Sequence, residues 1–249
     1  MKQPQLKIEK TGNITIFGRE LIDENSVRQI KNCISSENDI AVLNADAHYG
    51  YGHPIGGAVA YRDKISLSGV GFDIACGNYA VRTDIPVKSV NIAGVMDEIV
   101  RRISFGIGRP NNEPVDHPVL EKINRAEFVP QRKLSRLARE QLGTVGSGNH
   151  FVDLFEDDDG FLWTGVHFGS RGFGHRTTMG FIAMSRGYSF DEKVREGSMD
   201  SPPILFGQDS EIARDYIGAM TLAGEYAYAG RELVVKKVLE ILGNPDITF

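Results

Sequence analysis

Four stretches of the chain alternate apolar with polar residues, or stay apolar over the length of a strand, and they predict β-strands. Residues 39–48, DIAVLNADAH, carry Asp46 and His48 at what would be the C-terminal end of a strand. The other stretches are residues 56–69, which predict a hairpin around Arg62 to Lys64, residues 78–85, and residues 150–170, which predict a strand, an acidic turn and a second strand.

In other parts of the chain, apolar residues recur at the spacing of a helix. Apolar residues three and four positions apart follow Asn91 and predict a helix: Ile92, Val95, Met96, Ile99, Val100 and Ile103. Residues 131–142 predict a helix with a basic face, and residues 210–243 predict one kinked helix or two, ended by Gly243 and Asn244-Pro245. Without an internal repeat or a low-complexity linker, the pattern predicts an α+β fold, in which mixed β-sheets are surrounded by helices, as a single domain over residues 1–249.

Length and composition restrict the class of protein only broadly. The chain has 249 residues, of which 41% are hydrophobic and 24% charged, which is enough to bury a core. Its apolar runs are far too short to span a membrane, and its first ten residues lack the apolar core of a signal peptide. Two cysteines cannot form a disulfide framework, which favours a cytoplasmic location. The net charge of −5 gives no general attraction to nucleic acid, so RNA contacts would have to be local.

Glycine is the enriched residue type, with 28 copies that gather in four clusters. The clusters are HYGYGHPIGG (48–57), SGVGFDIACG (68–77), LGTVGSGNHF (142–151) and HFGSRGFGH (167–175). Each glycine cluster contains a histidine, cysteine or aspartate beside residues that lack a Cβ, and such backbone can approach a ligand closely. The clusters therefore predict loops that share a single site.

A carboxylate, a thiol and two imidazoles from these clusters are the candidate metal ligands: Asp73, Cys76, His150 and His167. This is a normal donor set for a divalent metal, and a thiolate can bridge two ions. Each residue also has an ordinary interpretation: Cys76 as a small buried hydrophobe, Asp73 as a turn residue, and the two histidines as a strand cap and a core residue.

The cluster around GSGNHF has a second possible use. Successive amides from Gly146 to Asn149 can form an anion-binding nest, and Arg171 in GSRGFGH offers a fork for phosphate. Without a GxxxxGK[ST] pattern this is no P-loop, and Arg171 can equally pair with a surface carboxylate.

The order DAH, a later aspartate and GNH also fits a dinuclear metallophosphoesterase. Against that alternative, Phe151 follows GNH where an acidic residue is expected, no G-H-x-H follows, and Cys76 would have no role.

Five motifs resemble, in order and approximate spacing, the RtcB family of RNA-splicing ligases. They are NADAHYGYGHPIGGAVAY, ISLSGVGFDIACGNYAVRT, LGTVGSGNHFVDL, VHFGSRGFGH and EYAYAGREL. The resemblance runs from about residue 40 to the C-terminus and implies an RtcB-like fold. It also implies an enzyme that joins RNA 3′-phosphate or 2′,3′-cyclic phosphate ends to 5′-hydroxyl ends, with GTP and two Mn²⁺ ions as cofactors.

The resemblance also implies roles for individual residues. Asp73, Cys76, His150 and His167 would be metal ligands, with Cys76 bridging the two ions. The segment Asn149, His150, Phe151, Val152 and Asp153 would contact the guanine nucleotide. Asp46 and Arg171 would lie near the reacting phosphates. Ligand softness alone would favour Zn²⁺ over Mn²⁺, so manganese comes from the resemblance and not from these residues.

Members of the family are longer than this chain, and the resemblance places their guanylylated histidine and a further metal-binding histidine beyond Phe249. The remaining histidines, His48, His53, His117 and His175, match other positions. We therefore expect a fragment, one half of a split enzyme, or a short relative that binds metal or RNA without ligating. In each case we expect an incomplete second metal site and no GMP adduct on this chain alone. A possible activating protein is a further expectation.

RNA recognition is weakly encoded. The cations that could follow an RNA backbone are Arg101, Arg102, Arg132, Lys133, Arg136, Arg139, Arg171 and Arg176. For the group at residues 131–139, a solvated helix face is an equal alternative.

Overall fold

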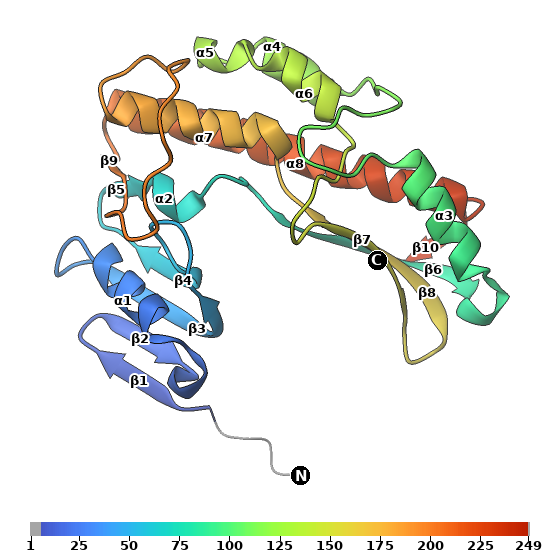
Figure 1. The fold of residues 1–249 in the computed structure, drawn as a ribbon, viewed down its shortest axis with the longest axis horizontal. Helices are drawn as coiled ribbons and strands as arrows, with labels where there is room; N and C mark the ends of the chain where they lie inside the picture. Colours follow the sequence, from blue (N-terminus) through green and yellow to red (C-terminus); the bar gives the residue numbers. More distant parts are fainter. Residues whose placement is uncertain (1–5, 249) are drawn as a thin grey trace. The chain divides into compact units, whose positions relative to one another are not determined.

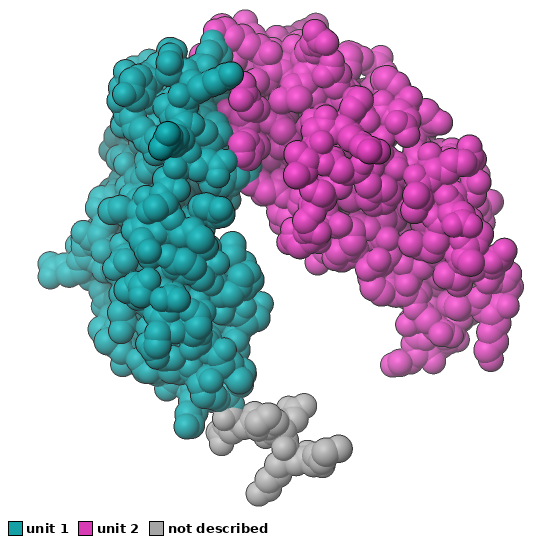
Figure 2. Space-filling view, viewed as in Figure 1, with its two compact units in different colours: residues 1–72, 178–216 teal, residues 73–177, 217–249 magenta. Residues whose placement is uncertain are grey.

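The computed structural model describes residues 6–248, so residues 1–5 of the segment inspected for a signal peptide, and Phe249, lie outside it. The chain divides into two compact units, which we describe separately (Figure 2). Unit 1 comprises residues 1–72 and 178–216, and unit 2 comprises residues 73–177 and 217–249. The single domain expected from the sequence stays a prediction. Within the described residues, no helix is both long enough and apolar enough to cross a membrane.

Unit 1 contains a four-stranded sheet in the order β1-β2-β3-β4 (Figure 1). Its strands are β1 (Ile8–Thr11), β2 (Ile14–Phe17), β3 (Ile40–His48) and β4 (Ile55–Ala60). β2 and β3 pair in parallel, and the other pairs are antiparallel. Helix α1 (Glu24–Cys33) begins at Asp23, whose carboxylate accepts hydrogen bonds from two amides of the first turn. The helix buries Val27 and Ile30 in a core shared with this sheet.

A second, two-stranded sheet in unit 1 corrects one expectation. Strand β5 (Lys64–Ser66) follows β4 but pairs with β9 (Leu205–Gly207), and the short helix α2 (Leu67–Val70) comes next. The hairpin expected at residues 56–69 is therefore wrong. The alternating pattern identified both strands, but it carries no information about a partner that lies far away in the sequence.

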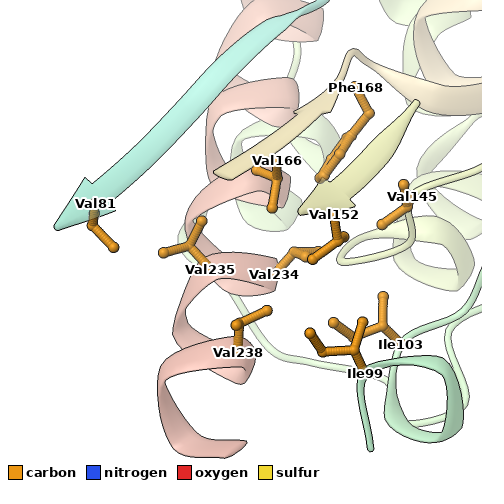
Figure 3. Close-up of a cluster of buried hydrophobic side chains, with 10 residues drawn as sticks. All are labelled: Val81, Ile99, Ile103, Val145, Val152, Val166, Phe168, Val234, Val235 and Val238. Atoms are coloured by element: carbon orange, nitrogen blue, oxygen red, sulfur yellow. The ribbon is translucent and has the colours of Figure 1, made fainter. Parts of the chain in front are cut away.

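Unit 2 contains an antiparallel sheet in the order β10-β6-β8-β7. Its strands are β6 (Gly77–Pro86), β7 (Phe151–Glu156), β8 (Phe161–Phe168) and β10 (Ile247–Thr248). One core cluster packs the sheet against helices α3 and α8 (Figure 3). Val81, Val166 and Phe168 come from the strands, and Ile99 and Val234 come from the two helices.

Besides α1 and α2, the described residues form six α-helices. They are α3 (Ile92–Arg102), α4 (Pro118–Asn124), α5 (Val129–Arg132), α6 (Ser135–Gln141), α7 (Arg171–Ser185) and α8 (Glu211–Ile241), and two short 3₁₀ turns lie at Arg19–Leu21 and Val87–Ser89. The boundary between the two units falls within α7 and again within α8. Helix α8 is followed by Gly243 and Asn244, both of which have positive φ angles, as is usual after a helix end.

Most of the predicted elements are confirmed, and the class is the expected α+β. The strands at 39–48, 78–85 and 150–170 and the helix after Asn91 are present. The C-terminal segment is one helix of 31 residues. The basic helix at 131–142 is shorter than predicted, because α5 ends before α6 begins. The fourth glycine cluster is not a loop throughout: from Arg171 onward it forms the start of α7.

Candidate metal centre

The segment from Asp73 to Cys76 is a tight turn directly before β6. The amide of Cys76 donates to the carbonyl of Asp73 at 3.0 Å. Ala75, inside the turn, has a φ of +55°, which is uncommon for a residue with a Cβ and is maintained only where neighbouring structure fixes it. The turn thus presents a carboxylate and a thiol at the start of a sheet strand.

The two histidines lie at the same edge of this sheet. His150 immediately precedes β7, and His167 is the penultimate residue of β8. Because β8 pairs antiparallel with both neighbours, His167 lies opposite Asn78 on β6 and opposite Phe151 on β7. Strand pairing therefore brings together residues that are 74 and 91 positions from Cys76.

The four predicted ligands lie close together, with Cys76 common to two groups. In the first group, the ligand atoms of Asp73, Cys76 and His150 all lie within 4.8 Å of one another. In the second, the Sγ of Cys76 lies 3.4 Å from the Nε2 of His167. The same sulfur is 3.6 Å from the Nε2 of His150. These distances suit a bridging thiolate, and the role of the four residues as ligands stays a prediction.

Hydrogen bonds at the far side of each ring orient the two imidazoles. The Nδ1 of His150 lies 3.0 Å from the carbonyl oxygen of Val145, and the Nδ1 of His167 lies 2.9 Å from the Oδ1 of Asn78. Both oxygens can only accept, which favours the tautomer with the proton on Nδ1; at His150 the Arg171 Nη1, which can only donate, competes for the same nitrogen. Such partners fix the tautomer of metal-binding histidines in other proteins. They leave both Nε2 atoms directed at Cys76.

The donor set fits a divalent cation. The Nε2 of His150 and the Oδ2 of Asp73 are 2.8 Å apart, and the His150 side chain is only 9% exposed. A proton or a metal cation between these two atoms satisfies both, whereas two facing lone pairs would repel. Carboxylate, thiolate and imidazole are the ordinary ligands of such a cation.

In the first group, the pKa of the Asp73 carboxyl is lowered and the pKa of the Cys76 thiol is raised. Burial alone would raise the pKa of Asp73, but hydrogen bonds from His150 and Cys76, with the nearby positive charges, lower it overall. Desolvation and the Asp73 carboxylate raise the pKa of the Cys76 thiol to about 12. Burial and the charge of His150 lower the pKa of His167. At neutral pH the metal-free thiol is protonated, which disfavours a nucleophilic role, because the thiolate is the reactive species.

Arg171 begins helix α7 beside the GSGNHF segment. Its φ is +54°, and its Nη1 lies 3.1 Å from the Nδ1 of His150. A Cβ on Gly146 would overlap the guanidinium, so the residue there must be glycine for Arg171 to pack as it does. Burial lowers the pKa of Arg171, and the Asp73 charge opposes that shift. Among the described residues, its hydrogen-bonding neighbours are the Thr144 hydroxyl and the His150 ring, with Asp73 as a nearby negative charge, and its role near a phosphate stays a prediction.

The residues predicted to contact a nucleotide are in different environments. Asn149 is exposed, and Phe151 stacks on His167 with ring centroids 5.4 Å apart and planes inclined by 19°. Val152 is buried in the core of unit 2, and Asp153 lies opposite Gly165 on β8. The nucleotide contacts of the 149–153 segment stay a prediction.

Asp46 lies on β3 of unit 1, where its side chain is exposed. Its expected position near the reacting phosphates stays a prediction.

Several of the cations considered for RNA contact are paired with acidic residues on the surface. The pairs are Arg101 with Glu98, Arg102 with Glu240, Arg136 with Glu140, and Arg139 with Asp116. This pairing favours a solvated surface over a continuous RNA track at these positions.

Sequence reasoning missed two contacts of the His167 ring: Phe151 stacks on it, and Asn78 hydrogen-bonds to it. Asn78 directly follows the Asp73–Cys76 motif and its glycine, but its contact with His167 depends on the register between β6 and β8. That register cannot be read from either strand alone.

Comparison with known proteins identifies the family. The sequence matches the family described as tRNA-splicing ligase RtcB over residues 29–129 and 115–245. It is 27% identical to the tRNA-splicing ligase RtcB of Pyrobaculum aerophilum, over 80% of this chain and 51% of that protein. It is 26% identical to the ligase of the same name from Archaeoglobus fulgidus, over 89% of this chain and 56% of that protein. The chain thus spans about half the length of the curated relatives it matches. Because the family match extends over most of its residues, this chain belongs to the RtcB family.

Proposed function

We propose that this chain carries the metal-binding part of a GTP- and Mn²⁺-dependent RNA ligase. The reaction would join RNA 3′-phosphate or 2′,3′-cyclic phosphate ends to 5′-hydroxyl ends, in tRNA splicing or RNA repair. The observation that supports the proposal most is the position of the Cys76 sulfur, 3.6 Å and 3.4 Å from two imidazole nitrogens. The relatives from Pyrobaculum aerophilum and Archaeoglobus fulgidus are tRNA-splicing ligases, which supports RNA end joining. Family membership favours this function over the metallophosphoesterase alternative.

The residues would hold two cations with one ligand in common. Asp73, Cys76 and His150 would bind the first, and Cys76 with His167 would bind the second. Two ligands are too few for a stable site, so the second ion needs further donors, as the resemblance also implies. Bound divalent cations neutralise charge on phosphoryl oxygens and orient the reacting groups.

The chain's own groups would then position the RNA phosphate. The Arg171 guanidinium is fixed over Gly146 and offers several N–H donors in one plane. Gly146 and Gly148 have φ angles of +92° and +82°, and backbone of this kind would allow the adjoining amides to form an anion-binding nest. For Asp46, in unit 1, a role near the reacting phosphates is proposed from the family resemblance alone.

Manganese, GTP, an activating protein and a cytoplasmic location remain parts of the proposal that come from the family resemblance and the composition. The donor set by itself suits Zn²⁺ at least as well. Metal identity should therefore be measured and not assumed.

Elemental analysis of the purified chain tests the metal centre. We expect a bound divalent transition metal in the wild type, its loss in Cys76→Ala, and its retention in Cys33→Ala. Cys33 is a matched control because it is the other cysteine and lies buried in unit 1. A wild type without metal, or equal metal in Cys76→Ala and wild type, would contradict the proposal.

A second experiment tests the expectation for the nucleotide. Incubation with labelled GTP and Mn²⁺, followed by a denaturing gel, should show no covalent GMP on this chain alone. A labelled band of the correct mass would show that a side chain within these residues accepts GMP, which would contradict the proposal.

A further inference from the structure

The motif EYAYAGREL contains a buried cation that the proposed metal centre does not use directly. Arg231, in helix α8, is 3% exposed. Its Nη1 donates to the carbonyl oxygens of Ala75, at 2.8 Å, and Phe168, at 2.6 Å. Its guanidinium carbon lies 4.7 Å from the centre of the Tyr228 ring. Among the described residues, the recorded partners of Arg231 are therefore carbonyls and a ring rather than a carboxylate.

Both carbonyls belong to segments that carry predicted metal ligands. Ala75 lies between Asp73 and Cys76, in the turn with the positive φ angle. Phe168 directly follows His167 at the end of β8. Through one nitrogen atom, Arg231 joins the turn that presents the carboxylate and the thiol to the strand end that presents an imidazole.

A second contact joins the same two segments. The amide of Ser170 donates to the carbonyl of Ile74 at 3.1 Å. Both central carbonyls of the turn, those of Ile74 and Ala75, are thereby satisfied from outside it. This bonding accounts for the unusual backbone of Ala75, because an αL residue with a Cβ persists only where its surroundings determine it.

The pattern of the helix allows Arg231 to reach these carbonyls. A Cβ on Gly230 would lie 3.2 Å from the Phe168 ring, and a Cβ on Gly224 would lie 3.7 Å from the Cβ of Ala75. An alanine at position 230 would crowd the Phe168 ring, whereas 3.7 Å at position 224 is an ordinary contact that shows how closely α8 approaches the turn there. Tyr226, between them, is buried and donates from its hydroxyl to the Ala138 carbonyl at 2.9 Å.

A role limited to filling space does not explain an arginine here. A buried charge is costly, and an apolar residue of similar size would fill the same volume without that cost. Burial lowers the pKa of Arg231, and the negative charges that Tyr228 and Cys76 carry when deprotonated, together with the Asp73 carboxylate, oppose that shift. The guanidinium therefore lies where it can offset negative charge on the thiolate and carboxylate ligands.

We propose that Arg231 is a positioning residue for the metal centre: it ties the Asp73–Cys76 turn to the end of β8 and so fixes the distances between the ligand atoms of Cys76 and His167. This inference rests on the proposed metal-binding function. It assigns a role to EYAYAGREL that involves neither RNA nor nucleotide.

The test uses two variants and one matched control. Arg231→Met removes the donors and the charge, and Arg231→Lys keeps the charge but loses the planar fork. Arg82→Lys is the control, because Arg82 also lies over an aromatic ring, 4.3 Å from the centre of Phe161, and is ion-paired to Asp157 in the same unit.

Amide hydrogen exchange on the metal-free chain measures how firmly Arg231 holds the Asp73–Cys76 turn against the end of β8. We expect the Cys76 and Ser170 amides to exchange at least tenfold faster in Arg231→Met than in the wild type, and at the wild-type rate in Arg82→Lys. Equal rates in the Arg231 variants and the wild type would overturn the inference, whether or not metal binds. If Arg231→Met does not fold, the same comparison is made with Arg231→Lys.

Titration with Co²⁺ measures whether loss of the Arg231 contacts changes metal affinity and coordination by the Cys76 thiolate. We expect the wild type to show thiolate-to-cobalt charge-transfer absorption, and both Arg231 variants to bind at least tenfold more weakly with an altered spectrum. Faster exchange with unchanged affinity and spectrum would overturn the positioning role. If the wild type takes up no Co²⁺, the metal-binding function itself fails, while the exchange rates still decide whether Arg231 holds the turn.

Discussion

We expect Asn78→Leu to weaken metal binding by the chain without unfolding it. Asn78 is exposed, and its Oδ1 accepts a hydrogen bond from the Nδ1 of His167 at 2.9 Å. Leucine has nearly the same shape but no acceptor, so the imidazole loses the group that selects its tautomer. The Phe151 ring, stacked on the other side, would still limit how far the imidazole tilts.

The size of the effect follows from comparable contacts in metalloproteins. Loss of a partner that orients a metal-binding histidine typically lowers affinity 10–100-fold, or about 1.4–2.7 kcal/mol. Because Asn78 is exposed, its substitution leaves no buried polar group behind, and the free energy of unfolding should change by less than about 0.5 kcal/mol. The prediction is thus a large change in affinity with a small change in stability.

Competition of the chain with a chromogenic chelator for Zn²⁺, Mn²⁺ and Co²⁺ measures the affinity, and thermal unfolding of the metal-free chain measures stability. Asn78→Asp keeps an acceptor and should bind at least as well as the wild type. Asn124→Leu is the control for an exposed asparagine, since its recorded contact is a neighbouring glutamate on α4. Wild-type affinity in Asn78→Leu would refute the argument that this hydrogen bond orients His167.

Three further predictions concern protons and backbone. Metal uptake should release the proton of Cys76, because the pKa of this thiol is raised to about 12. The metal affinity should therefore rise up to about tenfold per pH unit between pH 6 and 8. An affinity that stays constant over this pH range in calorimetric titrations would contradict this. Gly146→Ala should displace Arg171 and weaken pyrophosphate binding more than Gly148→Ala does. The Gly148 variant is the control, because its backbone has a similar positive φ angle but a Cβ there would point into open space. Equal losses of pyrophosphate affinity in the two variants would exclude the explanation through Arg171. The Asp39 carboxylate, with a pKa lowered to about 2 by two serine hydroxyls and two amides against the opposing effect of burial, contributes stability above pH 4 that is lost toward pH 2. In urea unfolding, Asp39→Asn should therefore cost about 1–2 kcal/mol at pH 7, and the deficit should shrink below pH 4.

Sequence periodicity predicted those elements whose burial pattern is local. The strand ending in Asp46 and His48, and the helix after Asn91, follow from alternation and from helical spacing within one segment. The hairpin at residues 56–69 failed because the partner of β5 is β9, about 140 positions later. The start of α7 was missed because glycines at 172 and 174 resemble a loop, although Gly172 allows the helix to pack against Gln141 and Gly174 leaves room for the preceding Ser170 side chain.

The candidate site was predictable in its residue types but not in its supporting contacts. Asp73, Cys76, His150 and His167 attract attention because their donor chemistry is distinctive and glycines surround them. The contacts that orient them are carbonyls, an amide oxygen and a ring face, which many residues could supply. Such partners become recognisable only when strand register and helix approach are known.

The register also explains how ligands scattered along the chain can meet. β8 is the strand shared by both pairings, so its last residues face β6 on one side and β7 on the other. His167 is therefore held laterally from two directions, by Asn78 and by Phe151, whereas His150 precedes the edge strand and depends on the Val145 carbonyl. The turn at Cys76 precedes β6 and lies outside the strand pairs of the described residues, so its carbonyls are bonded by the Ser170 amide and by Arg231 of α8. The turn that carries the shared sulfur therefore also depends on contacts from residues far away in the sequence.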